Sequence, residues 1–542
     1  MRRVWLILSV CAAAYGFQAQ APPKGSIEGQ VVNLKSGAPL KKANIRLSMV
    51  NVGSGGRGMV VTNARAAETD EQGHFSFTGL DAGKYRLSAE RQGFLRQSYG
   101  ERKFSGGGTG VLVADGQNVK GINFKLSPQG VITGKVLDED GEPMANVQVR
   151  VHRNMYTSGR RQWVMINSAN TTDIGEYRLP DLQPGRYLVS TLARVPNRNP
   201  ILNSSEPLPP TPDMTYAATF YPNTTDSNTA VPIDVGAGDE IRGIDIRPVK
   251  ARVWRVRGKA TGPSGGRGAV QVSLSSSEGP GGDRLVAIAR PPDGQFEIRN
   301  VPSGSYILHA QTQGGAQLWA ATMPVQVTGS HVEGLMVNLA SGGDVQGTVK
   351  LVDATEAVDL KNLSVMLRAV GFAGAAPPRS RVGDDMKFTL KSVPPIKFAV
   401  SVSGYPNTCY LKSVQYNGRD VPAEGIEMSG SGTLAVTISA GAAQVDAVVL
   451  GKDGQAAGGA VVAVIPKDGG NTMVYTVDDT GVLTIKGLKP GDYRMLAWED
   501  VEQGAPFDPD FTRKYEGQMK SVTLDSAGHQ AVQLNAIPAD SK

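Results

Sequence analysis

Short runs of alternating apolar and polar residues recur along the whole chain. Residues 75–77 (Phe-Ser-Phe) and 177–179 (Tyr-Arg-Leu) alternate with period two, which is typical of a strand with one buried face. Turns follow, such as residues 182–185 (Leu-Gln-Pro-Gly), where proline presets φ and glycine permits positive φ. A second strand then begins at a tyrosine, as in residues 187–189 (Tyr-Leu-Val). Because helical periodicity is almost absent, the pattern predicts an all-β protein.

The strand–turn–strand unit repeats at intervals close to one hundred residues, the size of one β-sandwich domain. In the first copy, Phe75 is followed five residues later by Leu80 and five residues after that by Tyr85. The turn glycine and the following tyrosine of the four full copies are Gly83 and Tyr85, Gly185 and Tyr187, Gly304 and Tyr306, and Gly491 and Tyr493. A tyrosine in this place resembles the tyrosine corner of Greek-key sandwiches, where the hydroxyl caps nearby backbone.

One copy of the unit is degenerate. Phe388, Val393 and Phe398 keep its spacing, but Met386 and Ile396 replace its glycines. Since phenylalanine has no hydroxyl, we expect a looser corner in this copy.

An opening strand with a central glycine precedes most copies, as in residues 132–136 (Ile-Thr-Gly-Lys-Val), and closing strands run almost directly into the next opening strand. These signals predict a semi-rigid tandem array. The predicted segments are a signal peptide (1–21), module 1 (22–127), module 2 (128–249), module 3 (250–340), the degenerate module 4 (341–441) and module 5 (442–542).

The N-terminus has the order of a secretory signal. Arg2 and Arg3 precede an apolar run at residues 4–14, and small residues follow. We therefore expect a secreted, periplasmic or cell-surface protein without a transmembrane helix in the mature chain, because no second stretch reaches membrane length. Lipidation at Cys11 stays open as an alternative, although the bulky Val10 disfavours it.

Charge and cysteine content bear on nucleic-acid binding and on disulfide formation. Removal of the signal peptide lowers the formal net charge from +6 to +4, and basic and acidic residues are interspersed, so we expect no nucleic-acid binding. Only Cys409 remains in the mature chain, which excludes an intramolecular disulfide and predicts a buried or idle thiol.

Together these motifs resemble the carboxypeptidase regulatory-like domain, a transthyretin-like (prealbumin-like) sandwich related to the Cna-B-type repeats of collagen adhesins. The matching residues are the opening strands, residues 69–75 (Thr-Asp-x-x-Gly-x-Phe) and residues 182–187 (Leu-x-Pro-Gly-x-Tyr). The resemblance implies a tandem array of Ig-like or transthyretin-like Greek-key β-sandwiches with a carbohydrate-binding-like fold, of the kind found in large secreted bacterial proteins. Related adhesin repeats carry Lys–Asn isopeptide crosslinks, but no matching trio can be placed here.

The search for catalytic chemistry yields no candidate site. The five histidines are not spaced as zinc ligands, and we expect them to be solvated strand residues: His74, His152, His309, His331 and His529. No nucleophile elbow or phosphate-binding loop is present. Asp138, Glu139 and Asp140 are a candidate calcium loop, but a solvated hairpin turn is the favoured interpretation. The sequence therefore predicts no enzyme, no cofactor and no metal.

Aromatic residues outside the strand pattern are the candidate ligand contacts, because exposed rings can stack on sugars or pack at interfaces. They are Trp163, Tyr216, Phe220, Tyr221, Trp319 and Trp498, for each of which anchoring of a loop on its own sandwich is the favoured interpretation. The favoured function is a non-catalytic extracellular or cell-envelope binding or scaffold protein, whose partners are polysaccharides or envelope proteins. An accessory array that docks to a secreted peptidase or glycan-degrading enzyme is the alternative, and a direct hydrolase is the least favoured.

Overall fold

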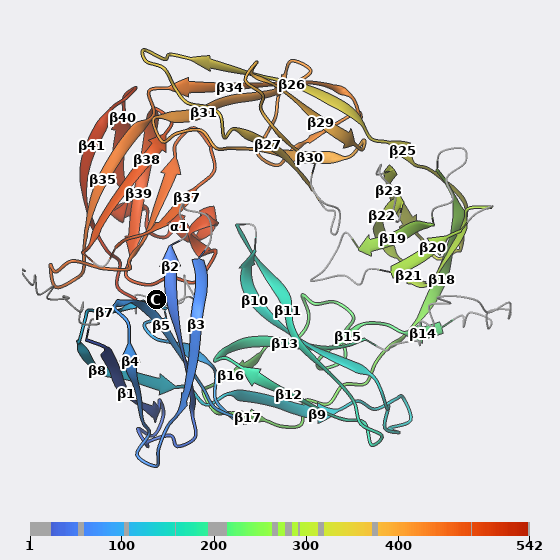
Figure 1. The fold of residues 1–542 in the computed structure, drawn as a ribbon. Helices are drawn as coiled ribbons and strands as arrows, with labels where there is room; N and C mark the ends of the chain where they lie inside the picture. The colour runs from blue at the N-terminus through green and yellow to red at the C-terminus, as the bar shows by residue number, and fades with distance from the viewer. Residues whose placement is uncertain are drawn as a thin grey trace, which may run out of the picture. The chain divides into compact units, whose positions relative to one another are not determined.

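The computed structural model describes residues 23–52, 59–101, 108–157, 159–192, 214–262, 269–276, 285–290, 293–312, 319–370, 378–478 and 480–539. Strands dominate these ranges, and helical turns are confined to residues 505–518 (Figure 1). The chain divides into two compact units whose main boundary falls between residues 129 and 130. The predicted signal peptide, including Cys11, lies outside the described residues.

Module 1 shows the frame that recurs along the chain. Its strands are β1 (Gly25–Asn33), β2 (Asn44–Val52), β3 (Met59–Glu68), β4 (His74–Leu80), β5 (Gly83–Glu90), β6 (Gln97–Ser98), β7 (Val111–Val113) and β8 (Asn118–Leu126). One sheet has the order β4-β1-β8, and the other has the order β3-β2-β5-β6 with β7 also paired to β5. The first and last strands run parallel, whereas the other pairs are antiparallel.

Module 2 repeats this frame with a longer hairpin. Its strands are β9 (Gly130–Lys135), β10 (Gln148–Thr157), β11 (Arg160–Asn170), β12 (Glu176–Leu182), β13 (Gly185–Leu192), β14 (Met214–Tyr216), β15 (Thr219–Phe220), β16 (Ile233–Val235) and β17 (Glu240–Ile241). The sheets are β12-β9-β17 and β11-β10-β13-β15, with β16 also paired to β13.

Module 3 follows the same order of strands. They are β18 (Lys250–Thr261), β19 (Val270–Ser276), β20 (Leu285–Ala289), β21 (Gln295–Pro302), β22 (Gly304–Thr312), β23 (Trp319–Val327), β24 (Val332–Asn338) and β25 (Ala340–Ser341). Strand β18 lies between β21 and β24 in one sheet, and β14 extends this sheet by pairing with the start of β18. The second sheet has the order β20-β19-β22-β23-β25.

Module 4 modifies the frame. Its strands are β26 (Gly343–Val352), β27 (Ser364–Ala369), β28 (Arg379–Arg381), β29 (Lys387–Val393), β30 (Lys397–Ser403), β31 (Cys409–Tyr416), β32 (Arg419–Asp420), β33 (Ile426–Glu427) and β34 (Gly432–Ala440). The sheets are β29-β26-β34-β31-β32 and β28-β27-β30-β33. Strand β31 thus joins the sheet that has three strands in module 1.

Module 5 returns to the simpler frame and adds a helical segment. Its strands are β35 (Ala443–Leu450), β36 (Val461–Pro466), β37 (Met473–Thr476), β38 (Val482–Leu488), β39 (Gly491–Trp498), β40 (Lys520–Leu524) and β41 (His529–Asn535). Between β39 and β40 lie η1 (Ala505–Phe507), α1 (Pro509–Arg513) and η2 (Glu516–Gln518). The sheets are β38-β35-β41 and β37-β36-β39-β40, so the predicted fold class, a tandem array of β-sandwiches, is confirmed.

Each sandwich encloses its own hydrophobic cluster between its two sheets. Representative buried side chains are Phe124, Val149, Leu274, Leu367 and Val462, one from each module. Burial of apolar surface at about 25 cal/mol per Å² is the main source of stability for such a core. Cys409, the one cysteine among the described residues, is buried in the module 4 cluster and forms no disulfide.

The four tyrosines that follow the turn glycines all cap the backbone four residues upstream. Tyr85 donates its hydroxyl hydrogen to Asp81 O at 2.8 Å, Tyr306 to Pro302 O at 3.0 Å and Tyr493 to Lys489 O at 2.6 Å. Tyr187 donates in the same way to Gln183 O. Since each ring is buried in its cluster, the hydroxyl ties the turn directly to the core.

Module 4 replaces this corner by a different contact. Phe398 is buried in the corner position but has no hydroxyl to donate. Tyr416 on β31 instead donates to Ser431 O at 2.5 Å and accepts from Ser429 N at 3.2 Å. The hydroxyl of Tyr416 therefore anchors the Gly-Ser segment that leads into β34.

Module 5 carries a second apolar cluster on the other side of its β36–β39 sheet. Its buried members include Val461, Leu496 and Trp498, and Phe511 and Tyr515 from the helical segment pack against them. Tyr156, near the end of β10, also packs on this cluster, with its ring centroid 5.8 Å from that of Phe511. This contact lies inside the compact unit that begins at residue 130.

Candidate interaction surface

In each module, one sheet contains the first strand of that module (β1, β9, β18, β26 or β35). The side chains on the outer face of this sheet differ from module to module, although the strand pairing is shared. Pairing between the first and fourth strands places two side chains directly opposite each other on this face. These pairs are Glu28 and Ser76, Thr133 and Arg178, Arg257 and Glu297, Gln346 and Thr389, and Asp446 and Thr484. Because the frame forms with all of these pairs, their identity is free to serve another purpose.

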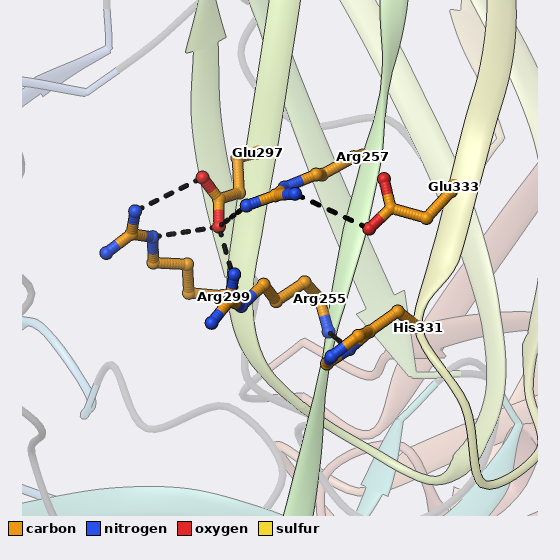
Figure 2. A network of polar contacts seen from close by, with 6 residues as sticks. All are labelled: Arg255, Arg257, Glu297, Arg299, His331 and Glu333. Atoms are coloured by element: carbon orange, nitrogen blue, oxygen red, sulfur yellow. Dashed lines mark hydrogen bonds and ion pairs between the residues drawn. The ribbon is translucent and has the colours of Figure 1, made fainter. Parts of the chain in front are cut away.

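Module 3 concentrates charge on this face, as Figure 2 shows. Alternation along β18 buries Val256 in the core and leaves Arg255 and Arg257 on the outer side. Glu297 and Arg299 occupy the same side of β21, and Glu333 lies at the start of β24.

Glu297 lies at the centre of these charges. Its Oε1 is 3.1 Å from Arg299 Nε, 3.3 Å from an Arg257 terminal nitrogen and 3.8 Å from Arg255 Nε. Arg257 also reaches Glu333, at 3.6 Å. Burial alone would raise the pKa of Glu297, but hydrogen bonds and attraction from Arg299 and Arg257 outweigh it and hold this pKa below its ordinary value. Glu297 is therefore ionised at neutral pH.

His331 borders the network and fixes the backbone of β18. The Arg255 backbone N–H donates to His331 Nδ1 at 3.1 Å, and the His331 ring lies edge-on to Trp254 with centroids 5.8 Å apart. The indole Nε1 of Trp254 donates to Ser303 Oγ at 3.0 Å. These contacts hold the strand that carries Arg255 and Arg257.

Among the described residues, basic side chains outnumber acidic ones on this part of module 3. Three guanidinium groups face two carboxylates in the network of Figure 2. Strand β18 also carries Lys250, Arg252 and Lys259 and contains no acidic residue. Sequence reasoning missed this site, although five basic residues within residues 250–259 are a detectable signal. Their common face becomes visible only when the strand register is known.

The acidic turn at residues 138–140 makes a second polar contact. Asp138 Oδ1 accepts from the backbone N–H groups of Asp140 at 3.0 Å and Glu142 at 2.8 Å, as in a hairpin turn. Glu139 accepts from Tyr216 at 2.8 Å and pairs with Lys250, which lowers the pKa of Glu139 to about 2. Among the described residues, no group of three or more His, Cys, Asp or Glu side chains could hold a metal ion.

The predicted ligand-contact aromatics do not gather in one place. Trp163 is half-buried on β11, and Trp319 is half-buried against the module 3 core. Tyr216 lies under the Lys250 ammonium, 5.4 Å from its ring centroid, while Tyr221 packs on the module 2 core.

Burial excludes ligand contact for two of the six candidate aromatics and agrees with loop anchoring. Trp498 is 2% exposed and Phe220 is 7% exposed. Trp498 is covered by Phe511 and Tyr515, and Phe220 packs on His152 with ring centroids 5.8 Å apart. These two rings anchor the chain to their own modules.

The expectation of solvated histidines is also wrong for two positions. His152 and His309 are 3% and 8% exposed. His152 Nε2 hydrogen-bonds Ser190 Oγ at 2.8 Å, and His309 Nε2 hydrogen-bonds Ser275 Oγ at 3.2 Å. By strand register, His152 of module 2 is equivalent to Ser275 of module 3, and Ser190 is equivalent to His309. Both modules therefore contain the same His–Ser hydrogen bond between two strands, with the histidine on opposite strands.

Residues 26–127 and 131–194 match the family model described as carboxypeptidase regulatory-like domain. Modules 1 and 2 are thus similar to carboxypeptidase regulatory-like domains over these residues. The match covers nearly all of module 1 and the first half of module 2, including the turn glycine and corner tyrosine of both. No curated protein matches the chain at a significant level.

The comparison with solved structures finds matches at low identity and low TM-score. A minor pilin of Streptococcus agalactiae is 14% identical over 45% of this chain and 99% of its own length, with a TM-score of 0.24. The major pilin subunit of Bacillus cereus is 11% identical over 58% and 99%, with a TM-score of 0.15. The TIE protein of Bacillus anthracis is 9% identical over 96% and 75%, also with a TM-score of 0.15. We draw no functional conclusion from similarity at this level.

Proposed function

We propose that this protein is a non-catalytic scaffold of the cell exterior, in which each sandwich is an independently folding domain. The observation that carries the proposal is repetition: the described residues form five two-sheet sandwiches, each with its own core, that share one frame with a modification in module 4 and present different outer sheet faces. Tandem domains of this kind give reach and let weak contacts add through multivalency. The secretory order of residues 1–21 supports placement outside the cytoplasm.

The burial of polar groups supports the same proposal. Among the described residues, the buried polar side chains are serine, threonine and histidine, and no Asp, Glu, Lys or Arg is buried. Catalytic acids and bases owe their shifted pKa values to desolvation and close charge partners in a cleft. Tyr177, whose pKa is raised by burial, instead caps Ile244 O of its own module. In addition, none of the described helices is long and apolar enough to cross a membrane.

A hydrolysis panel on the purified mature chain tests the proposal. Peptide, ester and glycoside substrates would be incubated with micromolar protein, with and without a chelator. We expect only the background rates of buffer controls. A saturable rate that exceeds those controls and is lost on heat denaturation of the protein would overturn the non-catalytic assignment.

A further inference from the structure

The outer face of module 3 is the strongest candidate for a binding site on the described chain. We propose that this face, built from Arg255, Arg257, Arg299 and Lys259, binds an extended acidic polypeptide segment. The inference names a partner class for the scaffold and so rests on the proposed function.

Comparison among the modules shows that the fold does not require these charges. The positions equivalent to Arg255 and Arg257 are Ser26 and Glu28 in module 1, Val131 and Thr133 in module 2, Asp344 and Gln346 in module 4, and Gln444 and Asp446 in module 5. Four modules thus build the same sheet without an arginine at either position. Module 3 therefore carries its arginine pair for a reason other than folding.

The balance of charge leaves room for another carboxylate. Arg255 is the least neutralised of the three arginines, because its ion pair to Glu297 is the longest, at 3.8 Å, and its Nε makes no hydrogen bond. The Arg255 side chain is still 26% exposed. A guanidinium group pairs with a carboxylate through parallel N–H donors, and such bonds are strong where water is partly excluded. An external carboxylate beside Arg255 would give this guanidinium group an acidic partner in addition to Glu297.

The spacing of the basic residues favours a polypeptide. Arg255, Arg257 and Lys259 lie at every second position of β18, where the pairing register shifts at Arg255 toward β21 and at Arg257 toward β24. An extended peptide with an acidic residue at every second position presents carboxylates at the same interval. Acids on such a peptide can meet Arg255 and Lys259, with Arg299 of β21 beside them. Arg257, between them on β18, already pairs with Glu297 and Glu333. Electrostatic complementarity of this kind governs specificity and the rate of association.

Fluorescence anisotropy with a labelled eight-residue peptide of alternating aspartate and threonine tests the inference. We expect saturable binding to the full mature chain at 50 mM NaCl, weakened at least tenfold at 500 mM NaCl. The double variant R255A/R257A should lose at least tenfold in affinity. The matched control R178A removes the exposed arginine on the equivalent face of module 2 and should bind like the unaltered chain.

Further arms separate the alternatives. R255K/R257K keeps the positive charges but removes the planar guanidinium groups, so its loss of affinity should be smaller than that of R255A/R257A. Circular dichroism checks that all variants fold. A peptide of the same composition with its aspartates contiguous should bind more weakly. Binding of polygalacturonate with the same arginine dependence, in the absence of peptide binding, would assign the face to a polysaccharide and overturn the inference. Absence of binding to either probe would also overturn it, while leaving the result of the hydrolysis panel unaffected.

Discussion

Gly347 and Phe388 lie directly opposite each other on β26 and β29, and a Cβ atom built on Gly347 would lie 2.0 Å from Phe388 Cζ. The same glycine–aromatic pair occurs in modules 1, 2 and 3 as Gly29 and Phe75, Gly134 and Tyr177, and Gly258 and Phe296. In module 5, Ala447 faces Leu483 instead. In module 4 the missing Cβ therefore makes space for the Phe388 ring. In modules 1 to 3 a Cβ atom would lie nearest to a backbone carbonyl oxygen of the closing segment, 1.8 Å from Ile122 O, 2.1 Å from Ile244 O and 2.3 Å from Leu335 O.

Substitution of Gly347 by alanine should destabilise module 4. The added methyl group forces the buried Phe388 ring to move, and such overpacking costs about 2 kcal/mol. Urea unfolding of the isolated module 4, or of the full chain if the isolated module does not fold, measures the loss.

A second substitution provides the internal control for this prediction. The double variant G347A/F388L copies the Ala–Leu pair of module 5. Its loss in free energy of unfolding should be smaller than the sum of the losses of the two single variants. Strict additivity of G347A and F388L would contradict the steric explanation.

The tyrosine corner of module 3 contributes stability that is lost at high pH. Burial raises the pKa of Tyr306 from 10.0 to about 12. The folded state therefore favours the neutral phenol, which contributes stability below pH 10 that is lost as the pH rises to about 12. The free energy of unfolding of the unaltered chain should fall more steeply than that of Y306F over this range. Parallel curves for the two proteins would show that the Tyr306 hydroxyl is not buried.

Glu139 should titrate far below an ordinary glutamate. A hydrogen bond from the Lys250 ammonium group, supported by the Tyr216 hydroxyl, lowers the pKa of Glu139 to about 2 from 4.5. The contact is therefore present above pH 4.5 and is lost as the pH falls toward about 2. Carboxyl carbon NMR, with E139Q to assign the signal, measures this value. A titration near pH 4.5 at low salt would mean that the contact does not form in solution.

The contact between Tyr156 and the second cluster of module 5 should protect α1 from local opening. Tyr156 meets Phe511, and Arg161 pairs with Glu502 at 2.7 Å while its guanidinium carbon lies 4.9 Å from the Tyr156 ring centroid. Loss of an aromatic pair costs about 1 kcal/mol, so Y156A should speed amide exchange in residues 509–513 about fivefold. W163F, which alters a half-buried ring of the same hairpin, is the control. Equal exchange in both variants would contradict the role assigned to Tyr156.

Much of the fold can be predicted from the sequence because several independent local signals indicate the same structure. Alternation, turn proline and glycine, and the spacing of Phe75, Leu80 and Tyr85 all specify the same strand–turn–strand unit. Even the degenerate copy keeps its backbone, since Met386 adopts φ 58° where the other modules have glycine. The sequence does not reveal that a non-glycine residue can hold this conformation.

Other features depend on register and on contacts between distant segments. Gly79, Asp181, Asn300, Ser392 and Gly487 occupy one equivalent position with positive φ, which Gly, Asn and Asp tolerate, but these residue types also occur in other conformations and so do not specify it. The arginines of module 3 read as interspersed charges until strand pairing places Glu297 opposite Arg257. Likewise, nothing near Trp498 in the sequence shows that Phe511 and Tyr515 cover it.

The most direct test of the scaffold account is a retention measurement that also records chemical change. The mature chain, immobilised on resin, would be exposed to solubilised envelope proteins and polysaccharides, and the eluted components would be analysed by mass spectrometry. The account predicts that at least one component is retained and is recovered with unchanged mass. Failure to retain any component, or recovery of cleaved products that are absent from a blank resin, would contradict it.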